Sequence, residues 1–114
     1  MSYDLAVWEG EHPSDDASAA AQYESLMDQM ESGELGEPSP RVRAYVEALL
    51  VRWPDIDEAE ESPWADSPLM GNATGPLVYF SMVFSQADEA STFAAALARE
   101  HGLVCFDPQM EALR

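Results

Sequence analysis

The chain has 114 residues, 46% of them hydrophobic, and this length and composition fit one folded domain spanning residues 1–114. Twenty-two acidic residues stand against five basic ones, all of them arginine, which gives a formal net charge of −17 at pH 7. Binding to nucleic acid or to an anionic membrane surface requires positive charge, so the composition excludes both classes of partner.

The cellular compartment is predicted from the absence of secretory, membrane-spanning and disulfide features in the sequence. The stretch MSYDLAVWEGEH at the N-terminus has no basic segment ahead of an apolar run, so no secretory signal is predicted. No apolar stretch approaches the roughly 20 residues that span a bilayer. The single cysteine, Cys105, has no partner for an intrachain disulfide, and its apolar run favours a buried, inert thiol over a reactive one. We therefore expect a cytoplasmic protein.

The first element expected in chain order is a strand over residues 3–9, which is rich in strand-forming side chains. A helix is predicted next, from an N-cap at Ser14 to about Glu31. Two aspartates follow this cap, where the helix dipole favours negative charge, and apolar residues recur at three- and four-residue steps. Two glycines and a proline then interrupt the chain in residues 32–38.

The second helix has the clearest pattern in the sequence. Ser39 is its expected N-cap, Pro40 takes the first helical position, and Pro54 ends it. Its apolar residues form one stripe, which predicts packing against a flat apolar surface. This stripe consists of Val42, Tyr45, Val46, Leu49, Leu50 and Trp53.

Residues 66–71 are predicted as a short strand and residues 72–75 as a turn. The strongest strand pattern follows at residues 77–84, where both faces carry apolar side chains, so this strand is expected inside the sheet. A third helix is predicted from an N-cap at Ser85 to a stop at Gly102, and a last strand over residues 103–107.

This order of elements predicts an α+β fold, and more closely a ferredoxin-like split βαβ sandwich. Its sheet is expected to be antiparallel or mixed, with all helices on one face. The other face would then be open to solvent or to a ligand. Tyr79 and Ser81 lie on that face and form the candidate small-molecule site.

The sequence contains no phosphate-binding glycine loop, no nucleophile elbow and no zinc-protease motif, so no catalytic residue, cofactor or metal site is predicted. The acidic segment after the second helix lacks the spaced glycine and final glutamate of a calcium loop. Asp4 and Asp107 lie on strands that are neighbours in the predicted fold. They are either an acid and base pair or solvated strand ends.

A segment rich in acidic residues follows the second helix and is the candidate surface for a partner. Its residues are Asp55, Asp57, Glu58, Glu60, Glu61, Trp64 and Asp66. Two interpretations of Trp64 stay open: an exposed aromatic anchor rimmed by carboxylates, or a side chain folded back onto the sheet. Residues 1–37 add ten acids and no lysine or arginine, and such a field speeds encounter with a cationic protein.

Two stretches, SYDLAVWEG at residues 2–10 and SQADEASTFAAALAREHGLVCFDPQ at residues 85–109, resemble a family of small bacterial proteins without an assigned enzymatic activity. Members of that family are similar to immunity proteins of bacterial toxin systems. The resemblance implies a cytoplasmic protein that is not an enzyme and that binds and blocks a toxin. Acidity fits this role where the toxin has a basic, phosphate-reading cleft.

Two other hypotheses stay open beside the inhibitor. One is a regulatory or small-molecule-binding domain that uses the open sheet face and that forms a homodimer. The other is an enzyme that depends on Asp4 and Asp107.

Overall fold

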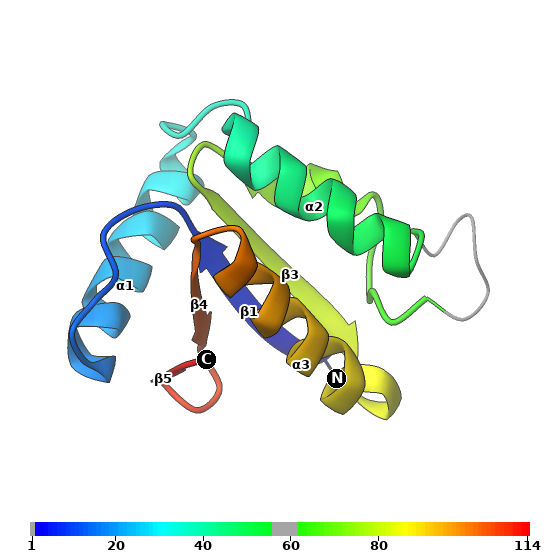
Figure 1. The fold of residues 1–114 in the computed structure, drawn as a ribbon. Coiled ribbons are helices and arrows are strands. Elements are labelled where there is room, and N and C mark those ends of the chain that lie inside the picture. The colour runs from blue at the N-terminus through cyan, green and yellow to red at the C-terminus, as the bar shows by residue number, and fades with distance from the viewer. Residues whose placement is uncertain (1, 56–61) are drawn as a thin grey trace.

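The computed structural model describes residues 2–55 and 62–114, and within them an antiparallel sheet of five strands forms the middle layer of the protein (Figure 1). The strand order is β2-β3-β1-β4-β5. The fold is therefore α+β. The strands are β1 (Ser2–Trp8), β2 (Ala73–Thr74), β3 (Leu77–Val83), β4 (Val104–Asp107) and β5 (Ala112–Leu113).

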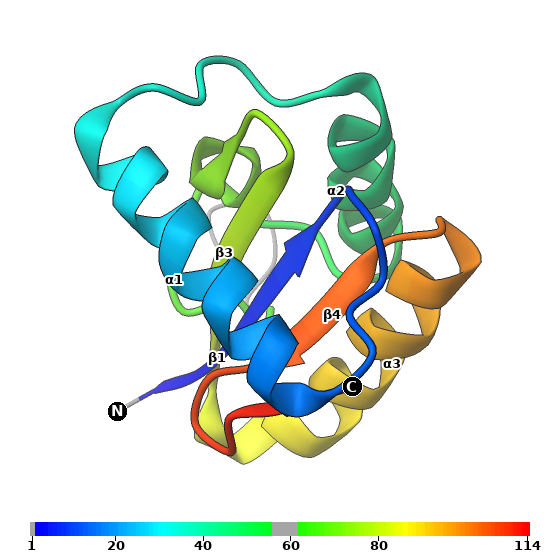
Figure 2. The same ribbon diagram turned by 90° about the vertical axis from the view of Figure 1, so that its left-hand side faces the viewer.

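Helices cover both faces of this sheet. Helix α1 (Asp16–Ser32) lies on one side, whereas α2 (Pro40–Arg52) and α3 (Phe84–Glu100) lie on the other (Figure 1). Figure 2 views the molecule from the α1 side, with this helix lying across the front of the sheet. The expectation that all helices share one face is wrong, because α1 has an apolar face of its own to bury.

Strand β1 explains why two faces need covering. Four consecutive residues, Leu5 to Trp8, are fully or almost fully buried, and successive side chains of a strand point to opposite faces. Leu5 and Val7 therefore join the core under α2 and α3, while Ala6 and Trp8 join the core under α1. A strand that is apolar on both faces requires a three-layer arrangement.

Strand β1 lies between β3 and β4. It pairs with β3 over its full length, from Ser2 opposite Val83 to Trp8 opposite Leu77, and with β4 through residues 6–8. The predicted pairing of the first strand with the strand over residues 103–107 is therefore confirmed. The prediction that residues 77–84 form an inner strand is also confirmed, because β3 has β2 on one side and β1 on the other.

The second helix matches its prediction at both ends. Ser39 is the N-cap, with its Oγ accepting a hydrogen bond from the Val42 amide at 3.2 Å, and Pro40 takes the first position. Val42, Tyr45, Val46 and Leu49 are buried along the predicted stripe. The N-caps of the other two helices differ from the predicted ones, by one residue in α1 and by two in α3. Asp15 rather than Ser14 caps α1, and α3 begins at Phe84 because β3 runs directly into it without a side-chain cap.

The expectation of a short strand at residues 66–71 is wrong. A 3-10 helix, η1 (Leu69–Asn72), occupies part of this range, and β2 begins only at Ala73. The strand starts later than expected because it belongs to a hairpin. Gly75 and Pro76 form a two-residue turn that pairs Thr74 with Leu77. Gly75 has φ +51°, and a Cβ there would lie 2.8 Å from the Leu35 carbonyl oxygen, so this position requires glycine.

Among the described residues, no helix combines the length and the apolar character needed to cross a membrane.

Candidate functional site

The acidic segment after α2 is described only at its two ends. Asp55 is half-buried, and its Oδ1 accepts a hydrogen bond from the Leu69 amide at 2.8 Å. Asp66 is exposed, and its Oδ1 accepts one from the Asn72 side-chain amide at 3.0 Å. Both carboxylates thus support the turn around η1. The other predicted partner-binding acids, Asp57, Glu58, Glu60 and Glu61, lie outside the described residues.

Trp64 is fully buried, so the interpretation as an exposed anchor is wrong and the alternative, a side chain folded back onto the sheet, is confirmed. Its Nε1 donates a hydrogen bond to the Trp53 carbonyl oxygen at 2.7 Å. Its ring stands edge-on to Trp53 and Phe80, with centroids 6.0 and 5.7 Å away.

The backbone around Trp64 explains this burial. The Val83 amide donates to the Pro63 carbonyl oxygen at 2.8 Å, and the Ala65 amide donates to the Ser81 carbonyl oxygen at 2.9 Å. Residues 63–65 thus run along β3 beyond the end of the short β2. Alternation along an extended segment then directs the Trp64 side chain into the core under α2 and α3.

The candidate small-molecule site on the sheet is covered by α1. Tyr79 is half-buried, its ring stacks on that of Tyr23 from α1 with centroids 6.4 Å apart, and its hydroxyl donates to Asp4 Oδ2 at 2.6 Å. Burial and the Asp4 carboxylate raise the pKa of Tyr79 well above its ordinary value. Ser81 lies opposite Asp4 in the β1 and β3 pairing. The expectation of an open sheet face is therefore wrong, and the described residues contain no pocket.

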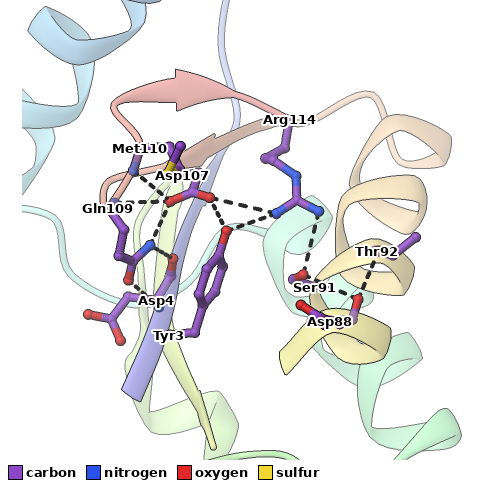
Figure 3. Close-up of polar contacts among 9 residues, drawn as sticks. All are labelled: Tyr3, Asp4, Asp88, Ser91, Thr92, Asp107, Gln109, Met110 and Arg114. Atoms are coloured by element: carbon purple, nitrogen blue, oxygen red, sulfur yellow. Dashed lines mark hydrogen bonds and ion pairs between the residues drawn. The ribbon is translucent and has the colours of Figure 1, made fainter. Parts of the chain in front are cut away.

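Asp107 is almost completely buried at the end of β4, where residues from three parts of the chain form hydrogen bonds or an ion pair with its carboxylate (Figure 3). Its Oδ1 accepts hydrogen bonds from the Gln109 and Met110 amides at 3.0 and 3.1 Å. Its Oδ2 accepts one from the Tyr3 hydroxyl and lies 3.7 Å from Arg114 Nη1. Burial acts to raise the pKa of Asp107, but these hydrogen bonds outweigh it and hold the pKa below its ordinary value.

Asp4 and Asp107 do not form an acid and base pair. The structure brings their strands together, but the Asp4 carboxylate points away from Asp107 (Figure 3) and accepts hydrogen bonds from Tyr79 and Ser2. The link between the two residues is Gln109. Its side-chain amide pairs with the Asp4 backbone, donating to the carbonyl oxygen at 2.7 Å and accepting from the amide at 2.5 Å.

The sequence did not indicate this network around Asp107. Arg114 donates to the Tyr3 hydroxyl at 3.2 Å and to Ser91 Oγ at 3.4 Å, which ties β1, α3 and the end of the chain together. These residues are far apart in the sequence and follow no short motif. The one local sign in the sequence was Pro108, which ends the last strand directly after Asp107.

Charge is divided between the two helical layers. Helix α1 carries four acids and no lysine or arginine, whereas α2 and α3 together carry four arginines and four acids. No lysine or arginine occurs before Arg41. The outer face of α1 and its flanking segments form what we call the acidic face, made of the exposed residues Glu11, Asp15, Asp16, Glu24, Asp28, Glu31, Glu34 and Glu37.

Other chemistry has little support in the described part of the chain. No three potential metal ligands gather in residues 2–55 and 62–114. Cys105 is buried in β4, and burial raises the pKa of its thiol to about 12, so the thiolate does not form near neutral pH. Comparison with protein families, with curated proteins and with solved structures finds no match to this chain.

Proposed function

We propose that this chain is a protein-binding domain that uses its acidic face to bind a cationic protein. Its role would be that of an immunity-type inhibitor, acting in the cytoplasm and covering the basic site of a toxin enzyme. The observation that carries the proposal is the division of charge, with four acids and no base on α1 against balanced charge on α2 and α3.

The spacing of the acids on α1 places them together on one side of the helix, so they form a continuous acidic surface. Glu24, Asp28 and Glu31 are exposed and follow one another at four and three residues, so they lie in one stripe along the outer side of the helix. Carboxylates held in a row on a helix suit the arginines and lysines of a phosphate-binding cleft. A stripe of this kind also speeds encounter with an oppositely charged partner.

The two competing hypotheses have lost the features on which they depended. A small-molecule domain relied on an open sheet face, and α1 covers Tyr79. An enzyme relied on two carboxylates acting together, and the carboxylate groups of Asp4 and Asp107 have separate hydrogen-bond partners. We therefore favour a binding role over an enzymatic one. The acidic segment over residues 55–61 remains a second candidate contact for the same partner.

We further propose that the fold is a ferredoxin-like split βαβ sandwich with α1 added on the outer face. The order β2-β3-β1-β4, with every pairing antiparallel, supports this assignment. In such a sandwich each βαβ unit encloses a strand of the other unit. Helices α2 and α3 share one face, as the two helices of that arrangement would.

The test uses a purified cationic partner, first captured with the wild-type chain from cells that encode it and identified by mass spectrometry. The affinity of this partner is then measured for the wild-type chain and for three variants, each with three acids replaced by arginine. These are Glu24→Arg with Asp28→Arg and Glu31→Arg on α1; Glu47→Arg with Asp88→Arg and Glu100→Arg on α2 and α3; and Asp57→Arg with Glu58→Arg and Glu60→Arg in the acidic segment.

We expect the α1 reversal to weaken binding about tenfold, from three contacts of roughly 0.5 kcal/mol each, and to flatten its salt dependence. The α2 and α3 reversal makes the same change in net charge and should have a much smaller effect. Loss of affinity only in the segment variant would move the contact from α1 to residues 55–61. Equal affinity in all variants would show that acidic contacts do not drive binding.

A further inference from the structure

Helix α1 is the least deeply buried of the three helices. Ala19 is its one fully buried residue, whereas α2 has four and α3 has six. The remaining apolar contact with the sheet comes from half-buried side chains: Ala20, Tyr23, Leu26, Met27 and Met30. The docked face of α1 therefore stays partly in contact with solvent.

Within the described chain, opening of α1 breaks two side-chain hydrogen bonds to strands: Trp8 Nε1 donates to Gln22 Oε1, and the Leu113 amide donates to Asp16 Oδ1, both at 3.0 Å. Irregular segments flank α1 on both sides, at residues 9–15 and 33–39. Its ends are capped within the helix and its own flanks, by Asp15 accepting from the Ser18 amide at 2.8 Å and by the Gly33 amide donating to the Met30 carbonyl oxygen at 3.1 Å. Because these caps belong to the helix itself, they are lost together with its backbone hydrogen bonds when α1 unfolds locally.

Electrostatic repulsion opposes the folding of α1 as a helix. Glu24 and Asp28 are a like-charge pair at four residues, and Asp28 and Glu31 at three, and both spacings destabilise a helix. Within the described chain, the acids of residues 9–37 form one ion pair, between Glu9 and Arg41 at 3.8 Å. The rest of the chain is also acidic, since the net charge is −17. Folding of α1 therefore brings together carboxylates that no lysine or arginine of this helix neutralises.

We infer that α1 unfolds locally as a separate layer, and that repulsion among its carboxylates makes this opening depend on ionic strength. Salt shortens the screening length from about 30 Å at 0.01 M to about 3 Å at 1 M, so it favours the docked helix. Opening exposes the apolar sheet face that α1 covers, formed by Ala6, Trp8, Leu77, Val104 and Phe106. This inference needs no partner and does not rest on the proposed function.

Amide hydrogen exchange of the full chain, read by mass spectrometry or NMR, tests the inference. We expect α1 amides to exchange faster than those of β1, β3 and α2, and to slow about two- to fivefold between low and high salt, from the loss of two like-charge pairs. The neutral variant Glu24→Gln with Asp28→Asn and Glu31→Gln should reproduce this slowing at low salt.

The matched control is Glu47→Gln with Asp88→Asn and Glu100→Gln, which makes the same change in net charge on α2 and α3. It should leave the exchange of α1 close to that of the wild type. Exchange of α1 as slow as that of β1 would overturn separate opening. An equal effect of both triple variants, or no effect of salt, would overturn repulsion within α1 as the cause.

Discussion

The burial of Trp64 gives the sharpest prediction about the stability of this fold. Replacement by alanine removes an indole that is fully buried against Trp53 and Phe80 and that donates a 2.7 Å hydrogen bond to the Trp53 carbonyl oxygen. Truncating a buried tryptophan to alanine costs about 3–5 kcal/mol. Domains of ordinary stability unfold at a cost of about 5–15 kcal/mol, so Trp64→Ala should remove a large part of the total.

A second substitution separates packing from hydrogen bonding. Trp64→Phe keeps an aromatic ring in the core and removes the Nε1 donor, which leaves the Trp53 carbonyl oxygen without that partner. A lost hydrogen bond of this kind costs about 1–3 kcal/mol. We therefore expect Trp64→Phe to be destabilised less than Trp64→Ala. Urea unfolding followed by far-ultraviolet circular dichroism measures both, with the slope of the transition showing whether the folded state remains compact.

The control is Val51→Ala on α2, where the side chain is 85% exposed and the expected change is within about 0.5 kcal/mol. If Trp64→Ala unfolded at the same urea concentration as the wild type, the burial of the indole would be wrong. An unchanged unfolding midpoint together with a lost partner contact would restore the exposed-anchor interpretation of Trp64.

Two further predictions concern Asp107 and Gly75. Because the pKa of Asp107 lies below its ordinary 3.8, the carboxylate stabilises the fold above about pH 4 and this contribution is lost as pH falls through its folded pKa. Asp107→Asn should lower the free energy of unfolding by about 1–3 kcal/mol at neutral pH, and the variant should lose less further stability in acid than the wild type. Thermal melting across a pH series measures both. Melting temperatures that fell equally with pH in variant and wild type would contradict this prediction. Gly75→Ala should lower the melting temperature more than Gly33→Ala. Both positions have positive φ, but the new Cβ meets the Leu35 carbonyl oxygen only at Gly75. Equal melting temperatures of the two variants would show that the hairpin accommodates the added Cβ without loss of stability.

The sequence determined the elements whose signals are local. A serine followed by proline fixed the start of α2, because an N-cap and a first-turn proline act within four residues. The apolar run at residues 77–84 identified β3 as an inner strand, since side chains on both of its faces needed cover. The uneven distribution of charge before Arg41 was also visible in the sequence, because charge belongs to residues and not to their packing.

Only the tertiary structure decided which surfaces these elements cover. Periodicity shows that α1 has an apolar side, but it does not say on which face of the sheet that side is buried, and this choice closed the surface around Tyr79. The burial of Trp64 depended on pairing with β3, almost twenty residues further along the chain. Asp107, Tyr3 and Arg114 meet only because the first strand lies beside β4. Contacts between residues so far apart in sequence are set by the packing of the whole chain, which no local pattern encodes.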